Sequence, residues 1–239
     1  KEQVFFDYKN FHIEIVDLPG AYSLNDYTIE EKVTKDFLNN EKYDIILNVL
    51  DSTNLQRNLL LTAELLTLDK KMIIALNMSD EAEKESILID EIQLSKILGK
   101  PCIKTSAAKK NGITKLLDEI LLKFQSQKVP SKFFFSNVIE EEIENISRVL
   151  EENKYETTET YRQISLGLLK ENKNIYKQFH DEPIWIKIQP ILTEAFEHLF
   201  IHFNSKNIKD IFNEERFAFA KGAVIETVKQ KNTNTTTLT

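Results

Sequence analysis

The first half of the chain alternates between two patterns of apolar residues. Three apolar runs have the length of buried strands: residues 45–50, 71–77 and 102–105. Three stretches repeat leucine and isoleucine at helical spacing: residues 55–66, 90–98 and 112–124. Short strands that alternate with helices are typical of a parallel sheet with both faces covered. The pattern therefore predicts an α/β fold for this half.

Two further elements precede this alternation. Residues 4–8 and 11–16 have strand character and are separated by only two residues, which predicts a short hairpin. Thr28 and Glu31 have the spacing of a capping box, so we expect a helix from Thr28 to about Leu38.

The pattern changes at residues 125–136, where Pro130 stands among Ser, Gln and Lys residues as in a linker. Beyond it no convincing strand is visible. Helical periodicity marks four stretches: residues 138–150, 161–171, 186–203 and 208–228. We therefore expect an α/β domain at 1–124, a linker at 125–136, an all-helical domain at 137–229 and a polar tail at 230–239.

Composition narrows the functional classes. The formal net charge of -7 argues against nonspecific binding to nucleic acid or anionic lipid. The single cysteine excludes an internal disulfide and favours a reducing compartment. The first 16 residues lack the apolar core of a signal peptide, and no apolar run approaches the ~20 residues of a membrane span. We expect a soluble chain.

Three short polar motifs stand at the carboxyl ends of predicted strands. They are Asp17-Leu18-Pro19-Gly20, Asn77-Met78-Ser79-Asp80 and Thr105-Ser106-Ala107. In open α/β sheets, ligands bind beyond the carboxyl ends of the strands. Each motif alone is a weak signal: D-x-x-G is frequent in turns, Asn77 or Asp80 can simply cap the next helix, and a T-S-A triplet carries almost no information.

Together the motifs carry groups that suit a guanine nucleotide. Asp17 can hold Mg²⁺, and Gly20 lets a backbone N–H approach a terminal phosphate. A carboxylate at Asp80 can accept hydrogen bonds from the N1–H and the 2-amino group of guanine, both of which adenine lacks. Asn77 can brace its loop, and the small residues around Ala107 let a backbone N–H approach the guanine oxygen.

The order of these motifs resembles the Ras-like class of GTP-binding proteins. A finer likeness is carried by three segments: residues 17–24 (DLPGAYSL), 48–59 (NVLDSTNLQRNL) and 75–83 (ALNMSDEAE). These resemble the ferrous-iron transport protein B (FeoB) family, closely up to about residue 124 and more loosely over the helical part. The resemblance implies a Ras-like P-loop GTPase sheet followed by the family's all-helical domain.

The resemblance also implies roles. Asp17 would hold Mg²⁺ through water, Gly20 would sense the γ-phosphate of GTP, and the loop at 21–28 would rearrange. Leu18 and Pro19 would belong to the same nucleotide-binding segment. Asn77 and Asp80 would select guanine, and Ser106 and Ala107 would close over the base. Met78 and Ser79 would be nucleotide-binding residues of the same loop.

For the protein as a whole, the resemblance implies the cytosolic part of a bacterial Fe(II) transporter at the inner membrane. GTP binding and hydrolysis would regulate or drive Fe²⁺ passage through a separate transmembrane region. That region, guanine nucleotide and small accessory iron-transport proteins are the implied partners, with no nucleic acid.

Two departures from the family pattern bear on activity. None of the five glycines begins a G-x-x-x-x-G-K-[ST] phosphate loop. We expect that loop in a sequence upstream of residue 1, so this chain alone is expected to be inactive. Ala21 stands where Ras-like GTPases often place a water-orienting glutamine, so hydrolysis is expected to be slow. A non-catalytic binding or scaffold module, and a GTPase of ribosome or tRNA maturation, stay open as alternatives.

Other residues invite a metal interpretation. His198 and His202 are four residues apart on a predicted helix, and Glu194 lies one turn earlier, but no further ligand is visible. A half-exposed helix boundary is the favoured interpretation. Three further features are expected to be structural: a buried Cys102, a solvated acidic run at Glu140, Glu141, Glu142 and Glu144, and an anchoring Trp185.

Overall fold

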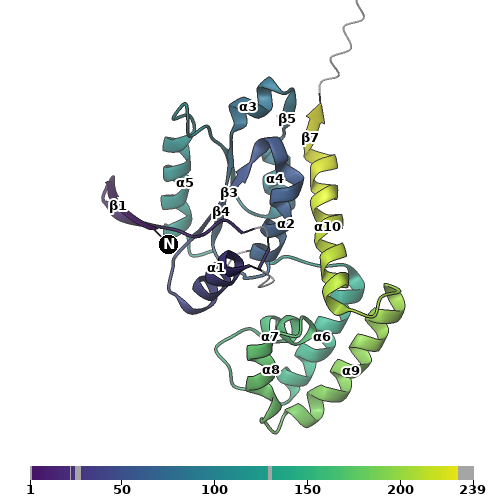
Figure 1. The fold of residues 1–239 in the computed structure, drawn as a ribbon. Helices are drawn as coiled ribbons and strands as arrows, with labels where there is room; N and C mark the ends of the chain where they lie inside the picture. The colour runs from purple at the N-terminus through teal and green to yellow at the C-terminus, as the bar shows by residue number, and fades with distance from the viewer. Residues whose placement is uncertain (1, 22, 25–27, 129–130, 231–239) are drawn as a thin grey trace, which may run out of the picture. The chain divides into compact units, whose positions relative to one another are not determined.

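A computed structural model describes residues 2–21, 23–24, 28–128 and 131–230 (Figure 1). The strands are β1 (Glu2–Tyr8), β2 (Phe11–Asp17), β3 (Ile46–Asp51), β4 (Met72–Asn77), β5 (Ile87–Ile89), β6 (Cys102–Lys104) and β7 (Val228–Gln230). The α-helices are α1 (Ile29–Asn40), α2 (Leu55–Leu66), α3 (Ser79–Lys84), α4 (Glu91–Leu98), α5 (Ile113–Gln125), α6 (Asn137–Glu152), α7 (Tyr161–Leu169), α8 (Lys173–His180), α9 (Trp185–His202) and α10 (Ile208–Thr227).

The central sheet is parallel, in the order β3-β4-β6. Its middle strand is buried on both faces, because residues 72–76 are each at most 2% exposed. Ile74 and Leu76 contribute to one apolar core, whereas Ile73 and Ala75 contribute to the other. A strand with a continuous apolar run is what such two-sided burial requires. The predicted α/β fold is confirmed.

Helices cover both faces of this sheet. Helices α2 and α4 supply Leu59 and Leu94 to the larger core, and α10 adds Ala220 and Ala223. Helix α5 supplies Leu116 to the smaller core on the opposite face. In Figure 1, α5 accordingly lies on one side of β3 and β4, with α2, α4 and α10 on the other.

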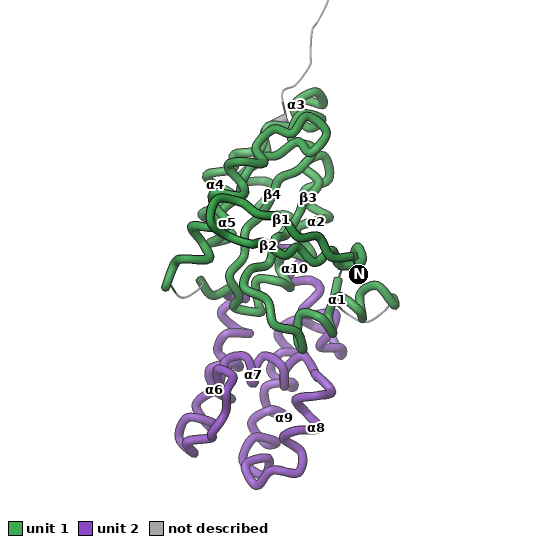
Figure 2. Tube along the Cα trace, turned by 90° about the vertical axis from the view of Figure 1, so that its left-hand side faces the viewer, with its two compact units in different colours: residues 1–133, 219–239 green, residues 134–218 purple. Residues whose placement is uncertain are grey.

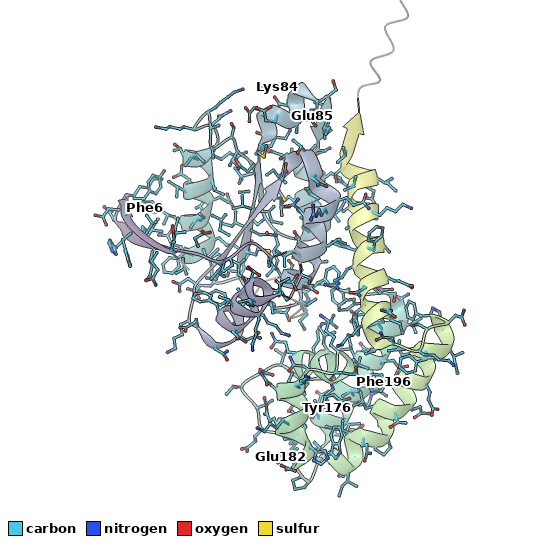
Figure 3. The ribbon with its side chains drawn as sticks, viewed as in Figure 1. Phe6, Lys84, Glu85, Tyr176, Glu182 and Phe196 are labelled. Atoms are coloured by element: carbon cyan, nitrogen blue, oxygen red, sulfur yellow. The ribbon has the colours of Figure 1, made fainter. Side chains whose placement is uncertain are left out.

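The predicted hairpin is present as a separate two-stranded sheet of β1 and β2. Its turn is formed at Lys9, which adopts a left-handed φ of 52°. Tyr8 and Lys9 both bind the Asp118 carboxylate of α5, at 2.7 and 2.6 Å. Phe11 packs edge to face on Phe124, with ring centroids 6.0 Å apart. The hairpin is thus attached to α5, and Phe6 marks it in Figure 3.

Four short elements were not apparent from the sequence pattern: α3, β5, α8 and β7. Strand β7 corrects the expectation that the second half contains no strand. It pairs antiparallel with β5, and the Asp90 N–H donates to the Thr227 carbonyl at 2.8 Å. Each of these strands has only three residues, so neither is long enough to show a period of two.

The chain forms two compact units, residues 1–133 with 219–239 and residues 134–218 (Figure 2). The expected helical domain at 137–229 divides the chain differently, because residues 219–227 of α10 belong to the α/β unit. Among the described residues, no helix combines the length and hydropathy that crossing a membrane requires.

The helical unit is held together by amphipathic helices. Helix α6 buries Ile139, Ile143, Ile146 and Leu150, which share one face at spacings of three and four residues. Trp185 is half-buried and lies edge to face against Tyr176 of α8, with ring centroids 5.6 Å apart. Trp185 therefore anchors α9 on α8.

Candidate functional site: two loops at the carboxyl edge of the sheet

The motifs that follow β4 and β6 are hydrogen-bonded to each other. Asn77 Oδ1 accepts from the Ala107 N–H at 3.1 Å and from the Thr105 hydroxyl at 3.4 Å. The N–H and the hydroxyl of Ser79 both donate to the Thr105 carbonyl, at 3.1 and 2.9 Å. Because β4 and β6 are parallel neighbours, their carboxyl ends bring the two motifs to one edge. Asn77 thus braces the loop that follows β6.

A left-handed residue turns the chain between Asn77 and Asp80. Met78 has a φ of 57°, an uncommon conformation for a residue other than glycine. Met78 is 41% exposed and stands between Asn77 and Asp80, the groups expected to bind the base. The turn starts α3 directly after the strand, which places Asp80 in the first turn of that helix.

Two neighbouring side chains keep Asp80 ionised by lowering its pKa. The Ser106 hydroxyl is the first, and the Lys109 ammonium lies 3.0 Å from Oδ2. Both contacts lower the pKa of Asp80, with the Ser106 hydrogen bond as the larger cause. The Asp80 side chain is only 15% exposed, whereas that of Lys109 is 57% exposed. The carboxylate is therefore a fixed acceptor at neutral pH.

The loop after β6 is closed at its base. Ser106 and Asn111 exchange two backbone hydrogen bonds of 3.0 Å each, and residues 107–110 form the exposed tip. Gly112 ends the loop with a φ of 75°, and a Cβ at this position would lie 2.1 Å from the Lys104 carbonyl oxygen. Only glycine fits that close approach, so Gly112 is required at the point where the loop passes into α5.

The third motif is attached elsewhere. Asp17 is exposed at the carboxyl end of β2, and the Cβ position of Gly20 faces open space. The Pro19 carbonyl accepts from the Thr34 hydroxyl of α1 at 3.0 Å. Among the described residues, hydrogen bonds join the Asn77–Asp80 motif to the Thr105–Ala107 motif. The Asp17–Gly20 motif is instead hydrogen-bonded to α1.

The segment after Gly20 is held by two buried carboxylates. The Ser23 hydroxyl donates to Glu31 of α1 at 2.8 Å, and the Leu24 N–H donates to the Glu64 carboxylate of α2. Glu31 and Glu64 are only 6% and 7% exposed. Tyr22 and residues 25–27, which belong to the predicted rearranging loop, lie outside the described residues.

The metal interpretation of His198 finds no support. His198 Nδ1 lies 2.5 Å from Glu142 of α6, and this contact raises the pKa of His198. The part of the chain that the structure describes contains no group of three or more His, Cys, Asp or Glu that could hold a metal.

The acidic run of α6 is only partly a solvated face. Glu142 is buried and Glu140 pairs with Arg162, so the expectation of a solvated face is wrong for these two residues.

Two residues of this region were missed by sequence reasoning. Lys109 gave no signal, because a lysine in a polar loop is ordinary. Glu64 could have been found, since a carboxylate between buried Ala63 and Leu65 needs a buried partner. Cys102 is buried as expected, and burial raises its pKa to about 12.

Two family models match the chain. The model described as "Ferrous iron transport protein B" covers residues 1–120, and the model described as "FeoB cytosolic helical domain" covers residues 135–229. These matches do not favour the alternative of a GTPase of ribosome or tRNA maturation.

Individual relatives agree with the family models. An Fe(2+) transporter FeoB of Campylobacter jejuni is 49% identical over 133 residues, which are 56% of this chain and 22% of the relative. An Fe(2+) transport protein A/FeoB fusion protein of Porphyromonas gingivalis is 30% identical over 98% of this chain and 28% of its own length. The chain thus spans less than a third of either relative.

A solved structure shares the fold over most of both chains. A GDP-bound point mutant of the S. thermophilus FeoB G-domain superposes with a TM-score of 0.79 at 26% identity, covering 95% of this chain and 90% of that one. The two family models, the alternating α/β unit and the helical unit lead to one conclusion: the chain belongs to the ferrous iron transport protein B family.

Proposed function

We propose that this chain binds guanine nucleotides and that Asn77, Asp80 and the loop of Ser106 and Ala107 read the base. The observation that carries the proposal is the mutual bracing of these two loops at the carboxyl edge of the sheet. A preformed pair of loops loses little conformational freedom when a base enters. The S. thermophilus relative is described as GDP-bound, which supports the same ligand class.

The chemistry of Asp80 favours guanine over adenine. An ionised carboxylate accepts from N1–H and from the 2-amino group, and adenine offers neither donor. The Ser106 side chain helps to keep this carboxylate ionised, because it lowers the pKa of Asp80. Asn77 fixes Ala107, whose N–H is the donor expected at the guanine oxygen and is bound to Asn77 Oδ1 in this structure. Met78 and Ser79 complete the turn that positions Asp80.

Asp17 fits a magnesium role. It is a single exposed carboxylate after a strand, and Mg²⁺ usually takes one or two carboxylates together with water and phosphate oxygens. The metal would neutralise charge on the phosphates. Leu18 and Pro19 are half-buried and leave Gly20 with open space above its Cα, where a terminal phosphate can approach the backbone.

This chain alone should bind weakly and should not turn over GTP. It contains no G-x-x-x-x-G-K-[ST] sequence, whose amides and lysine supply most of the grip on phosphates. Ala21 also cannot orient a water molecule. We expect hydrolysis at the background rate and GDP affinity weaker than micromolar. A fluorescent GDP titration that gives micromolar affinity or better contradicts this part of the proposal.

In the whole transporter, nucleotide binding here would regulate or drive Fe²⁺ passage through the transmembrane region, at the cytoplasmic face of the inner membrane. The helical unit would relay the nucleotide state. The fused transport protein A in the P. gingivalis relative supports a small accessory partner. Hydrogen exchange on the intact transporter, with GDP or a non-hydrolysable GTP analogue, should change at residues 21–38 and in the helical unit together. A change confined to 21–38 contradicts the relay.

The binding proposal itself is tested with the chain and two nucleotides. We would titrate ¹⁵N-labelled chain with GDP and with ADP at millimolar concentrations and follow the amides of residues 77–80 and 105–111. GDP should shift these amides saturably and ADP should not. Equal responses to both nucleotides would show that the two loops do not read the base.

A further inference from the structure

We propose that Lys109 competes with the guanine base for Asp80, so that the loop at residues 106–111 is a built-in gate on base binding. The inference rests on the proposed function and adds the regulation of that same site. It starts from the 3.0 Å contact between the Lys109 ammonium and Asp80 Oδ2.

The ammonium and the base need the same acceptor. Guanine engages Asp80 with two N–H donors, which point at both carboxylate oxygens. Lys109 places its own donor on one of these oxygens. The Ser106 hydroxyl also binds the carboxylate, but it comes from the closed base of the loop and can stay, because a carboxylate accepts about four hydrogen bonds. Lys109 is therefore the group that the base displaces.

The same loop also donates a hydrogen bond to Asn77, the second side chain of the proposed base site. The Ala107 N–H, two residues before Lys109, donates to Asn77 Oδ1 at 3.1 Å. The loop thus supplies one donor to Asp80 and one to Asn77. Without nucleotide, Lys109 gives the partly buried Asp80 carboxylate a second partner beside the Ser106 hydroxyl.

Moving the Lys109 side chain away from Asp80 should require little free energy. Residues 107–110 are exposed, and the 57% exposed Lys109 side chain can move into water without leaving a buried gap. The two backbone bonds between Ser106 and Asn111 hold the base of the loop while its tip moves. An ion pair of this exposure contributes only a small free energy, which corresponds to about a two- to fivefold effect on affinity.

The test compares two lysines of one loop. Lys109→Met removes the competing charge but keeps an apolar stem of similar length, and Lys110→Met makes the same change in net charge at the next residue. We expect Lys109→Met to bind GDP about two- to fivefold more tightly than the unaltered chain, and Lys110→Met to bind like it. Added salt should narrow the difference between Lys109→Met and the unaltered chain, because salt screens the ion pair.

Each outcome decides a different point. If Lys109→Met binds GDP equally or more weakly while GDP is still preferred over ADP, the gate is refuted and base reading stands. If neither the unaltered chain nor Lys109→Met prefers GDP over ADP, both the proposed base recognition and the proposed gate are refuted. A carboxyl NMR titration should show a higher Asp80 pKa in Lys109→Met than in the unaltered chain, and an unchanged pKa contradicts the ion pair.

Discussion

Gly112 allows the sharpest test of how the base-reading loop is held. It combines a left-handed φ of 75° with a close approach, because an added Cβ would lie 2.1 Å from the Lys104 carbonyl oxygen. The carbonyl belongs to the backbone of β6, so it cannot turn aside as a flexible side chain could. Gly112→Ala must therefore move β6, the start of α5, or both.

The magnitude has two parts. An alanine in the left-handed region costs about 1–2 kcal/mol relative to glycine. Relieving the clash displaces backbone at the end of a buried strand, which adds strain of order 1–3 kcal/mol. We therefore expect Gly112→Ala to destabilise the α/β unit by about 2–5 kcal/mol.

Gly222 is the matched control. It lies inside α10, and a Cβ there meets nothing within 4 Å. Replacing a helical glycine by alanine stabilises by about 0.5–1 kcal/mol. The same substitution should thus have opposite signs at two positions of one compact unit.

Hydrogen exchange of the β4 amides measures both effects, because this buried strand should exchange only when the α/β unit opens. The free energy of opening should fall for Gly112→Ala and rise slightly for Gly222→Ala. If Gly112→Ala lowers it by less than about 0.5 kcal/mol, the close approach is not a constraint and the reasoning is refuted. An equal loss in Gly222→Ala would show that the effect is not specific to Gly112.

Two further predictions follow from buried or paired groups. Cys102 is 6% exposed and its pKa is raised to about 12, so iodoacetamide should leave the native chain unlabelled and should label it in urea; rapid native labelling contradicts the burial. Glu142, with smaller contributions from Glu141 and Glu194, raises the pKa of His198 above its ordinary value of about 6.5. The contact therefore stabilises the folded state fully below about pH 6.5, and this stabilisation is lost as the pH rises through the folded-state pKa. The loss of stability in His198→Ala should therefore shrink from about pH 6 to about pH 9 in urea unfolding, and a constant loss contradicts the ion pair.

The sequence was most informative where one residue pattern had one physical meaning. A continuous apolar run such as β4 can only be buried on both faces, and Thr28 caps α1 because its hydroxyl accepts from the Glu31 N–H at 3.1 Å. The β5–β7 pairing could not be predicted, because three-residue strands have no readable period and are separated by more than a hundred residues of chain.

The sequence predicted the hydrogen-bond acceptors of the candidate site, Asp80 and Asn77. It did not predict the side chain that pairs with Asp80. Asp80 and Asn77 stood out because carboxylate and amide groups follow strands of the predicted sheet. The partner of Asp80, Lys109, depends on how the loop closes at Gly112, and a left-handed turn directs side chains in a way that spacing alone does not encode. Pairing in such loops has to be seen in three dimensions.

The most direct test of base reading is a change of base preference. Asp80→Asn replaces one acceptor oxygen by an amide donor, which pairs with the 2-oxo group of xanthine and not with the 2-amino group of guanine. In millimolar NMR titrations of the chain, the unaltered protein should prefer GDP over XDP by about tenfold or more, and Asp80→Asn should prefer XDP. An unchanged order of GDP and XDP in Asp80→Asn would contradict the assignment of Asp80 as the residue that reads guanine.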